Sequence, residues 1–253
     1  MAMYEIRHAY DSLQVAEEKP GELSLEARLR AINRPLLDWY RNHARILPWR
    51  EDPKPYHVWI SEIMLQQTRV EAVKPYFERF LEALPDISAL AAVEDDRLMK
   101  LWEGLGYYNR ARNLKKAAQV IVHEYEGRMP SEYQELLKLP GIGSYTAGAI
   151  ASIAFGKPVP AVDGNVLRVI SRVTASRRDI LKASTKKWME DRLRETMPQS
   201  EASDFNQGLI EIGAIVCVPN GQPKCGQCPL ASVCLSRQQE LCLLYTSPSP
   251  RDA

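Results

Sequence analysis

Four cysteines near the C-terminus are the residues of this chain best suited to bind a metal. The compact spacing C-x7-C-x2-C-x5-C is formed by Cys217, Cys225, Cys228 and Cys234. Both a 4Fe-4S cluster and a structural zinc ion accept four thiolates, so the ligands alone leave both open. A zinc site more often has two CxxC pairs, whereas a lone cysteine flanks each side of the single CxxC here, which favours the cluster. Disulfides fit poorly, because the only other cysteine is Cys242.

Two carboxylates are candidates for acid-base chemistry. Glu62 lies in VWISEIMLQQT (58–68), a largely apolar helical stretch that could desolvate the acid and raise its pKa. The alternative is a glutamate on the wet face of that helix. Asp163 lies in VDGN, directly before a predicted helix, where its ordinary role would be an N-cap. The residues by themselves leave both alternatives open.

A glycine-containing turn between two helical stretches is typical of DNA-backbone binding. Residues 139–143 read LPGIG, the pattern of a helix-hairpin-helix turn, in which Gly141 and Gly143 let the backbone approach a phosphate. A plain helix end followed by a new helix is the alternative. Two basic groups could supply further phosphate contacts, although a solvated helix face is the commoner meaning of such groups. These groups are Arg110, Arg112, Lys115 and Lys116, and Arg168, Arg172, Arg177 and Arg178.

The elements that must position these residues are all predicted to be helices. Apolar residues recur three and four apart in about ten segments, and no alternating strand of useful length is present, so the fold class is all-α. We expect helix starts at Ser131, Ser184 and Ser203, and helix ends at Gly127 and Gly156. The predicted helices are 25–41, 58–67, 72–83, 98–104, 111–125, 133–139, 145–155, 166–174, 187–197 and 205–217.

Composition indicates a cellular location for the protein but does not identify its binding partner. The 253 residues carry a formal net charge of +1, so a nucleic-acid surface would have to be a local patch. No stretch approaches a membrane span, and residues 1–23 lack an apolar signal core, so we expect a cytoplasmic, reducing location. The Ser- and Pro-rich tail, residues 243–253, resembles translated sequencing-adaptor readthrough and is predicted to be non-native.

Five sequence blocks together resemble the adenine DNA glycosylase family, MutY. Followed by the four-cysteine loop, they cover residues from about 25 to 235 in the family's order. The resemblance implies the helix-hairpin-helix DNA glycosylase fold, a 4Fe-4S cluster, and double-stranded DNA with adenine opposite 8-oxoguanine or guanine as the substrate. The blocks are LPWR (47–50), SEIMLQQT (61–68), WEGLGYYNRARNL (102–114), LPGIGSYTAGAIASIAFG (139–156) and VDGNVLRVISR (162–172).

The same resemblance implies how the chain is divided. Residues 1–23 would be an N-terminal extension, and residues 48–156 a six-helix barrel lobe that contains the hairpin. Residues 24–47 and 157–235 would form a discontinuous lobe around the cluster. DNA would lie across the cleft between the lobes of what we expect to be a bacterial, DNA-associated monomer.

The resemblance also assigns roles to individual residues. Glu62 would protonate adenine N7, and Asp163 would stabilise the oxocarbenium-like sugar, with help from Tyr145 and Asn165. Gln67 and Tyr107, with Leu65 beside them, match residues that intercalate where the adenine leaves the duplex. For Leu47 and Trp49, core packing is the alternative. The adenine pocket would be lined by Arg45, Leu47, Trp49, Arg50 and Gln207.

Three competing functions and two departures from the family pattern remain. Endonuclease III-type enzymes have a lysine nucleophile where this chain has Tyr145, and thymine-mismatch glycosylases lack the block around Glu62. A non-catalytic DNA-binding module would not need Glu62 and Asp163. The first cysteine gap holds seven residues, whereas six is the commoner number. The chain also ends before the Nudix-like C-terminal domain of longer members, so we expect a weakened preference for 8-oxoguanine.

Overall fold

The computed structural model describes residues 23–242, and these residues form helices without any strand. The predictions for the extension up to residue 22 and for the tail 243–253 lie outside the described residues. No helix in the described range is long and apolar enough to cross a membrane. The α-helices are α2 Leu25–Ala31, α3 Asn33–His43, α4 Pro48–Glu51, α5 Pro55–Leu65, α6 Val70–Ala83, α7 Ile87–Ala92, α8 Asp95–Trp102, α9 Asn109–Glu124, α10 Tyr133–Leu136, α11 Ser144–Ala149, α12 Gly164–Val173, α13 Ala183–Thr196, α14 Ala202–Ile215 and α15 Leu235–Gln238.

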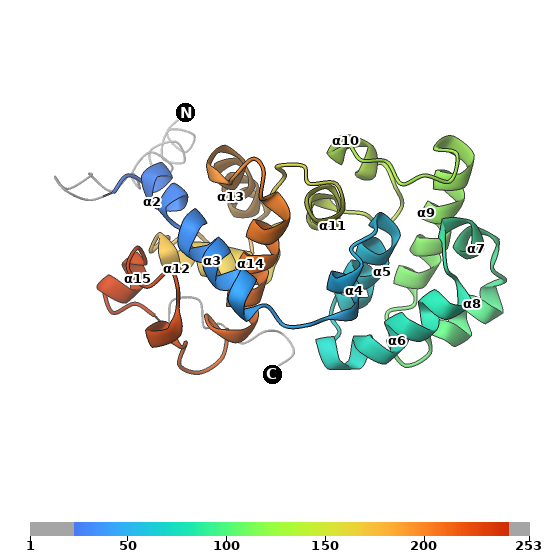
Figure 1. Cartoon of the computed structure of the whole chain (residues 1–253), viewed down its shortest axis with the longest axis horizontal. Coiled ribbons are helices and arrows are strands. Elements are labelled where there is room, and N and C mark those ends of the chain that lie inside the picture. The colour runs from blue at the N-terminus through green and yellow to red at the C-terminus, as the bar shows by residue number, and fades with distance from the viewer. Residues whose placement is uncertain (1–22, 243–253) are drawn as a thin grey trace, which may run out of the picture.

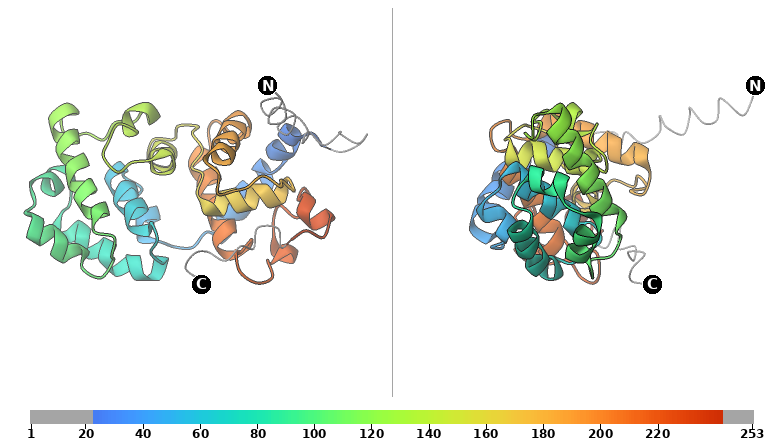
Figure 2. Two further views of the ribbon diagram at one scale, coloured as in Figure 1. Left: turned by 180° about the vertical axis from the view of Figure 1, so that it is seen from behind. Right: turned by 90° about the vertical axis from the view of Figure 1, so that its right-hand side faces the viewer.

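The helices bury two separate hydrophobic clusters. The central cluster is built from residues between Leu47 and Ala151, on α4 to α11. The terminal cluster combines Leu29–Leu37 of α2 and α3 with residues from Val162 to Leu230, mostly on α12 to α14. The chain therefore crosses between the clusters after α3 and again before α12 (Figure 1). From behind, the same two groups of helices lie side by side along the long axis (Figure 2).

Contacts between the two groups run through α14 and the segment that follows α11. That segment, η1 (Ile150–Ala154), is a π-helical continuation of α11, and it packs against α14. Gly148 is needed here, because a Cβ at this position would lie 2.4 Å from the Pro160 carbonyl oxygen. The close approach holds the second crossing segment against α11.

The predicted helical segments are present, but several of their ends differ. The segment 25–41 is split at Ile32, which ends α2 and begins α3. Gly127 and Gly156 do lie at helix ends and have φ values of 75° and 66°, which glycine adopts without strain. The predicted start at Ser131 is wrong, because α10 begins at Tyr133 and the Ser131 hydroxyl contacts the neighbouring Glu132 side chain.

Candidate active site

Glu62 lies within α5, a helix that is buried on nearly every side. Its neighbours Ser61 and Ile63 are buried, and Glu62 itself is only 7% exposed. A helix that is apolar on most faces has no wet side for a carboxylate. Burial, opposed by a hydrogen bond from Tyr145, raises the pKa of Glu62 from 4.5 to about 7. The Tyr145 hydroxyl donates to Glu62 Oε2 at 2.6 Å. Glu62 can therefore hold a proton near neutral pH.

Asp163 is the N-cap of α12 and also faces the same site. Its Oδ1 accepts from the Val166 N–H at 2.8 Å, and its Oδ2 accepts from Asn165 Nδ2 at 2.8 Å. Burial raises the pKa of Asp163, while these two hydrogen bonds and the nearby Arg168 act against that rise. Asp163 is therefore the N-cap of α12, and these hydrogen bonds also fix the orientation of its carboxylate.

Both carboxylates line one open cavity of about 870 Å³. Its walls come from α5, α9 and α11 on one side and from α12 and α14 on the other, so residues far apart in sequence meet here. A smaller adjoining cavity shares Glu62 and Tyr145 with it. The residues predicted for catalysis, intercalation and the adenine pocket all line one of the two: Arg45, Leu47, Trp49, Arg50, Glu62, Leu65, Gln67, Tyr107, Tyr145, Asp163, Asn165 and Gln207.

Leu47 and Trp49 also belong to the hydrophobic core. They are 3% and 6% exposed, and both pack in the central cluster. Trp49 meets Phe77 edge-on with ring centroids 5.5 Å apart. Core packing and pocket lining are thus compatible at these two positions, since one face of each side chain closes the smaller cavity.

Glu211 is a buried acid of the site that the sequence interpretation missed. It is 0% exposed on α14 and accepts from both Arg45, at 2.7 Å to Nε, and Arg50, at 2.9 Å. Burial acts to raise its pKa, but the hydrogen bonds from both arginines lower the pKa of Glu211 to about 2. The signal was in the sequence, because Glu211 stands in an apolar helical stretch just as Glu62 does. This ion pair ties α14 to the first crossing segment.

Two residues at the mouth of the large cavity have uncommon backbone angles. Gln67 has φ 58° and Tyr107 has φ 48°, in the left-handed region that non-glycine residues rarely adopt. The Tyr107 side chain is 61% exposed. Both residues line the cavity. Strained residues of this kind persist only where surrounding contacts hold them.

The hairpin glycines lie outside the two cavities. Gly141 has φ 76°, and a Cβ there would lie 2.7 Å from Cβ of Asn113 on α9, so the turn requires glycine both for its angle and for its packing. Gly143 is the N-cap of α11, and a Cβ there would meet nothing within 4 Å. The backbone at Gly143 therefore stays open to an approaching group.

A match to a protein-family model shows which superfamily this chain belongs to. The family described as HhH-GPD superfamily base excision DNA repair protein matches residues 60–199, which include Glu62, the hairpin and Asp163. The chain belongs to this superfamily.

Curated relatives and solved structures narrow the relationship of this HhH-GPD protein. It is 41% identical over 222 residues to the human adenine DNA glycosylase, covering 84% of this chain and 40% of that protein. It is 42% identical over 202 residues to the adenine DNA glycosylase of Buchnera aphidicola subsp. Baizongia pistaciae, covering 79% and 57%. The chain thus spans about half the length of the curated relatives it matches.

The solved structures have the same fold at lower identity. A thermostable thymine-DNA glycosylase superimposes with a TM-score of 0.76 at 29% identity, covering 84% of this chain and 97% of that one. A non-covalent endonuclease III–DNA complex gives 0.71 at 27% identity, covering 87% and 99%. The all-α, helix-hairpin-helix glycosylase fold expected from the sequence is confirmed.

Three arginines predicted to contact phosphate are instead bonded to protein carbonyls in the HhH-GPD fold. Arg168 and Arg172 are 7% and 2% exposed. Arg168 donates to the carbonyls of Gly213 and Cys217, and Arg172 to that of Cys217. Arg110 donates to carbonyls after α5 and after α8. The phosphate assignment is wrong for Arg168 and Arg172, because their guanidinium groups are buried against protein carbonyls. For the half-buried Arg110 it stays a prediction.

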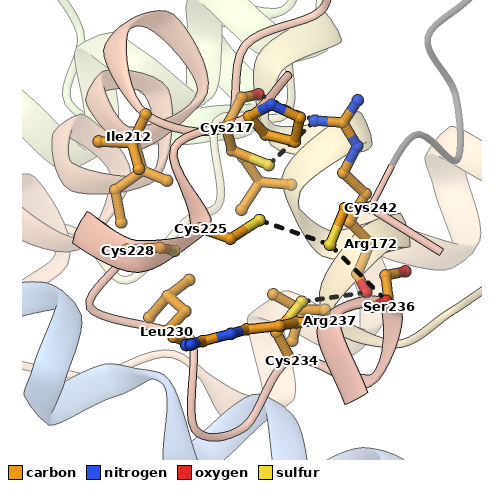
Figure 3. A pocket seen from close by; sticks show the side chains of 15 residues that line it. Arg172, Ile212, Cys217, Cys225, Cys228, Leu230, Cys234, Ser236, Arg237 and Cys242 are labelled. Carbon is orange, nitrogen blue, oxygen red and sulfur yellow. Dashed lines mark hydrogen bonds between the residues drawn. The ribbon is translucent and has the colours of Figure 1, made fainter. Parts of the chain in front are cut away.

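The four predicted metal ligands gather around one cavity beside α12 and α14 (Figure 3). Cys217, Cys225, Cys228 and Cys234 line it together with Cys242. Burial raises the pKa of Cys228 to about 12 and that of Cys225 to about 11, so without a metal these thiols stay protonated at neutral pH. Within residues 23–242, no three metal-binding side chains converge closely enough to hold a single ion.

Hydrogen bonds connect the cysteine cavity with the carboxylate site through α12. Arg172 Nη1 lies 3.3 Å from Cys217 Sγ, and Arg168 Nε donates to the Cys217 carbonyl at 2.9 Å. Arg168 Nη2 donates to Asn165 Oδ1 at 3.0 Å, and Asn165 in turn donates to Asp163. The same helix therefore fixes both the first cysteine and the amide that orients Asp163.

Proposed function

We propose that this protein removes adenine from double-stranded DNA by hydrolysing its N-glycosidic bond, where adenine is mispaired with 8-oxoguanine or guanine. The observation that carries the proposal is the meeting of Glu62, Asp163 and Tyr145 in one open cavity. The similarity to adenine DNA glycosylases supports adenine as the base. The endonuclease III–DNA complex, a related structure, supports DNA as the partner.

Glu62 is proposed to be the acid. Adenine is a poor leaving group as an anion, and a proton placed on N7 lets it depart as a neutral base. Glu62 is suited to this step because burial raises its pKa to about 7, so the carboxyl keeps a proton near neutral pH. Tyr145 holds Glu62 Oε2 and thereby fixes the orientation of the carboxyl.

Asp163 is proposed to stabilise the electron-poor sugar that remains. An oxocarbenium-like centre is stabilised by a nearby carboxylate, which can also capture it before water attacks. The Val166 N–H and the Asn165 amide both donate to Asp163 and so favour its ionised form. Two carboxyl groups with different hydrogen-bond partners can thus take opposite roles, as acid and as anion.

We propose that the two cavities receive a base that has left the duplex. Extrusion requires unstacking, and a side chain that fills the gap stabilises the extruded state. We propose that Gln67 and Tyr107, at the mouth of the large cavity, occupy that gap with Leu65 beside them. The adenine would then enter the smaller cavity, lined by Arg45, Leu47, Trp49, Arg50 and Gln207.

We propose that Cys217, Cys225, Cys228 and Cys234 hold a 4Fe-4S cluster. The four thiols line one cavity together, and four cysteine thiolates are the ligand set of a 4Fe-4S cluster. The buried Ser236 hydroxyl lines the same cavity without a hydrogen-bond partner, and a cluster sulfur could accept a hydrogen bond from it. When bound, such a cluster supplies iron–thiolate bonds that cross-link the loop.

The cavities favour a glycosylase that leaves the DNA backbone intact. Strand cleavage of the endonuclease III type needs a lysine amine to form a Schiff base with the sugar. Position 145, where such a lysine would stand, is tyrosine, and the described lining of the two cavities contains no lysine. Excision should therefore leave an intact abasic strand.

Replacing Tyr145 by phenylalanine should shift the pH dependence of excision upward. The Tyr145 hydroxyl lowers the pKa of Glu62 by hydrogen bonding to its charged form. Without the hydroxyl, Glu62 stays protonated to higher pH, so the alkaline fall in rate should begin later than in the wild type. The measurement is the single-turnover excision rate from pH 6 to 9 for both proteins. A shift to lower pH would contradict this arrangement.

A single-turnover assay tests the proposed function. Duplexes labelled on the adenine strand carry adenine opposite 8-oxoguanine, guanine or thymine, and product is analysed before and after alkali. We expect strand breaks only after alkali. Adenine should be excised far faster from both mispairs than from the A:T control. Breaks before alkali would reveal a lyase, and no product from folded, cluster-containing protein would overturn the proposal.

A further inference from the structure

Arg110 joins the two chain segments that carry Gln67 and Tyr107. It lies in the first turn of α9, beside the mouth of the large cavity. Its Nη1 donates to the carbonyls of Ile63 at 2.8 Å, Met64 at 3.0 Å and Gln66 at 2.5 Å. These carbonyls belong to the last turn of α5 and the residue after it, where helix geometry leaves acceptors unpaired. One guanidinium nitrogen thus caps the end of α5, just before Gln67.

The other nitrogen of the same guanidinium holds the second segment. Arg110 Nη2 donates to the carbonyls of Leu105 and Gly106, each at 3.1 Å. Those residues immediately precede Tyr107, and the guanidinium also lies 5.7 Å from the centroid of the Tyr107 ring. The planar fork of arginine can address two sets of acceptors at once, which a single ammonium cannot do.

The backbone of both segments needs such support. Gln67 and Tyr107 both have positive φ, a conformation that is unfavourable for their residue types. The segments are about forty residues apart in sequence, and contacts from Arg110 connect them directly. We propose that Arg110 is a positioning residue that holds Gln67 and Tyr107 as a rigid pair, so that both can enter the duplex together when the base leaves it.

This role rests on the proposed function and makes it more specific. A pre-formed pair of inserting side chains favours extrusion, because little additional order is needed when the base leaves the stack. The carbonyls that Arg110 binds directly precede Gln67 and Tyr107, so we expect Arg110 to affect base extrusion and to leave the bond-breaking step unchanged. The inference therefore predicts a selective defect.

Arg110→Lys and Arg110→Gln, with the exposed Arg34→Gln on α3 as the matched control, test the inference. Extrusion is followed by the fluorescence of 2-aminopurine placed at the target position opposite guanine. Both Arg110 variants should reduce the extrusion equilibrium by about tenfold, the effect of losing one or more charge-assisted hydrogen bonds. Arg34→Gln should match the wild type. Melting temperatures establish that the proteins are folded, and if Arg110→Gln unfolds, the charge-preserving Arg110→Lys decides.

A second DNA substrate distinguishes a positioning role of Arg110 from a nonspecific loss of activity in the variants. In a duplex with an abasic analogue opposite adenine, the base has lost its pairing partner and leaves the stack more easily. The Arg110 variants should lose less rate on this duplex than on the A:8-oxoguanine duplex, with the same pH profile as the wild type. Equal losses on both duplexes, or unchanged fluorescence, would overturn the inference. If the wild type excises adenine from neither duplex, the proposed function fails and this inference falls with it.

Discussion

Glu62→Gln is expected to lower the single-turnover rate of adenine excision by about 10²–10⁴-fold, the range typical for removing a general acid. Glutamine fills the same buried space in α5 and can still accept the hydrogen bond from Tyr145. It has no carboxyl proton to place on the base. Binding of the A:8-oxoguanine duplex should stay within a few-fold of the wild type, because Glu62 lies inside the cavity and carries no positive charge for the phosphates.

The pH dependence follows from the same carboxyl. Excision uses protonated Glu62, so the rate should fall as pH rises through about 7, the pKa to which burial raises this group. The free energy of unfolding also decreases as the pH rises. The folded state holds a proton on Glu62 that the unfolded chain, with a pKa near 4.5, releases, so stability is lost as pH rises between 4.5 and about 7. Glu62→Gln should therefore melt at a higher temperature than the wild type at pH 8.

An exposed glutamate provides the control for this prediction. Glu82 on α6 is exposed, so Glu82→Gln removes the same kind of carboxyl without touching the site. Its rate and melting temperature should match the wild type. If Glu62→Gln retained the wild-type rate, another group would have to deliver the proton. If its melting temperature fell at pH 8, the carboxyl would be better solvated than its surroundings indicate.

The helices were predictable because most of them place apolar residues on one face. Periodicity found α9, α12 and α14, each long enough to repeat its pattern several times. It missed α7, which has six residues and therefore less than two turns. Helix starts were less secure, since Ser184 and Ser203 each lie one residue inside a helix that begins at the preceding alanine. The local sequence predicts that a helix is present more reliably than it predicts where the helix begins and ends.

The site shows where sequence information ends. An acid in an apolar helix indicated Glu62, and the same reasoning applied to Glu211 would have found the ion pair behind the pocket. The roles of Arg110 and Arg168 could not be found in this way. Arg110 donates to the Gln66 carbonyl 44 residues away and Arg168 to the Cys217 carbonyl 49 residues away, and only tertiary packing shows whether a cation meets such a carbonyl or water. A count of nearby charges cannot make that distinction.

Cys228→Ser is expected to remove the proposed cluster, and with it the brown colour, and to weaken binding of the A:8-oxoguanine duplex by about tenfold or more. Cys228 is a sharper choice than Cys225. Cys225 Sγ lies 3.5 Å from Cys242 Sγ, so Cys242 is placed to substitute for it. Among residues 23–242, Cys228 has no thiol hydrogen-bonded to it, and its sulfur instead accepts from the backbone of Leu230.

The loss of binding has a local cause. Lys224, directly before Cys225, is exposed, and its backbone N–H is held by the Val216 carbonyl at 2.9 Å. Few side chains of the loop 217–234 are buried, so iron–thiolate bonds would provide much of its order. Without them, Lys224 would lose its fixed position. If Lys224 contacts a phosphate in the intact protein, the salt dependence of binding should become shallower by about one counterion.

Cys242→Ser is the matched control, because it removes a thiol from the same cavity that is not among the four proposed ligands. It should keep the absorption of the cluster and the wild-type affinity. Iron content, visible absorption and binding as a function of salt are measured together on the three proteins. If Cys228→Ser lost its iron but bound DNA as tightly and with the same salt dependence, the loop would be ordered by its own packing, and the cluster would have no part in recognition. If the variant bound less tightly at every salt concentration with an unchanged slope, the cluster would act through α12, where Arg168 and Arg172 connect Cys217 to the Asp163 site.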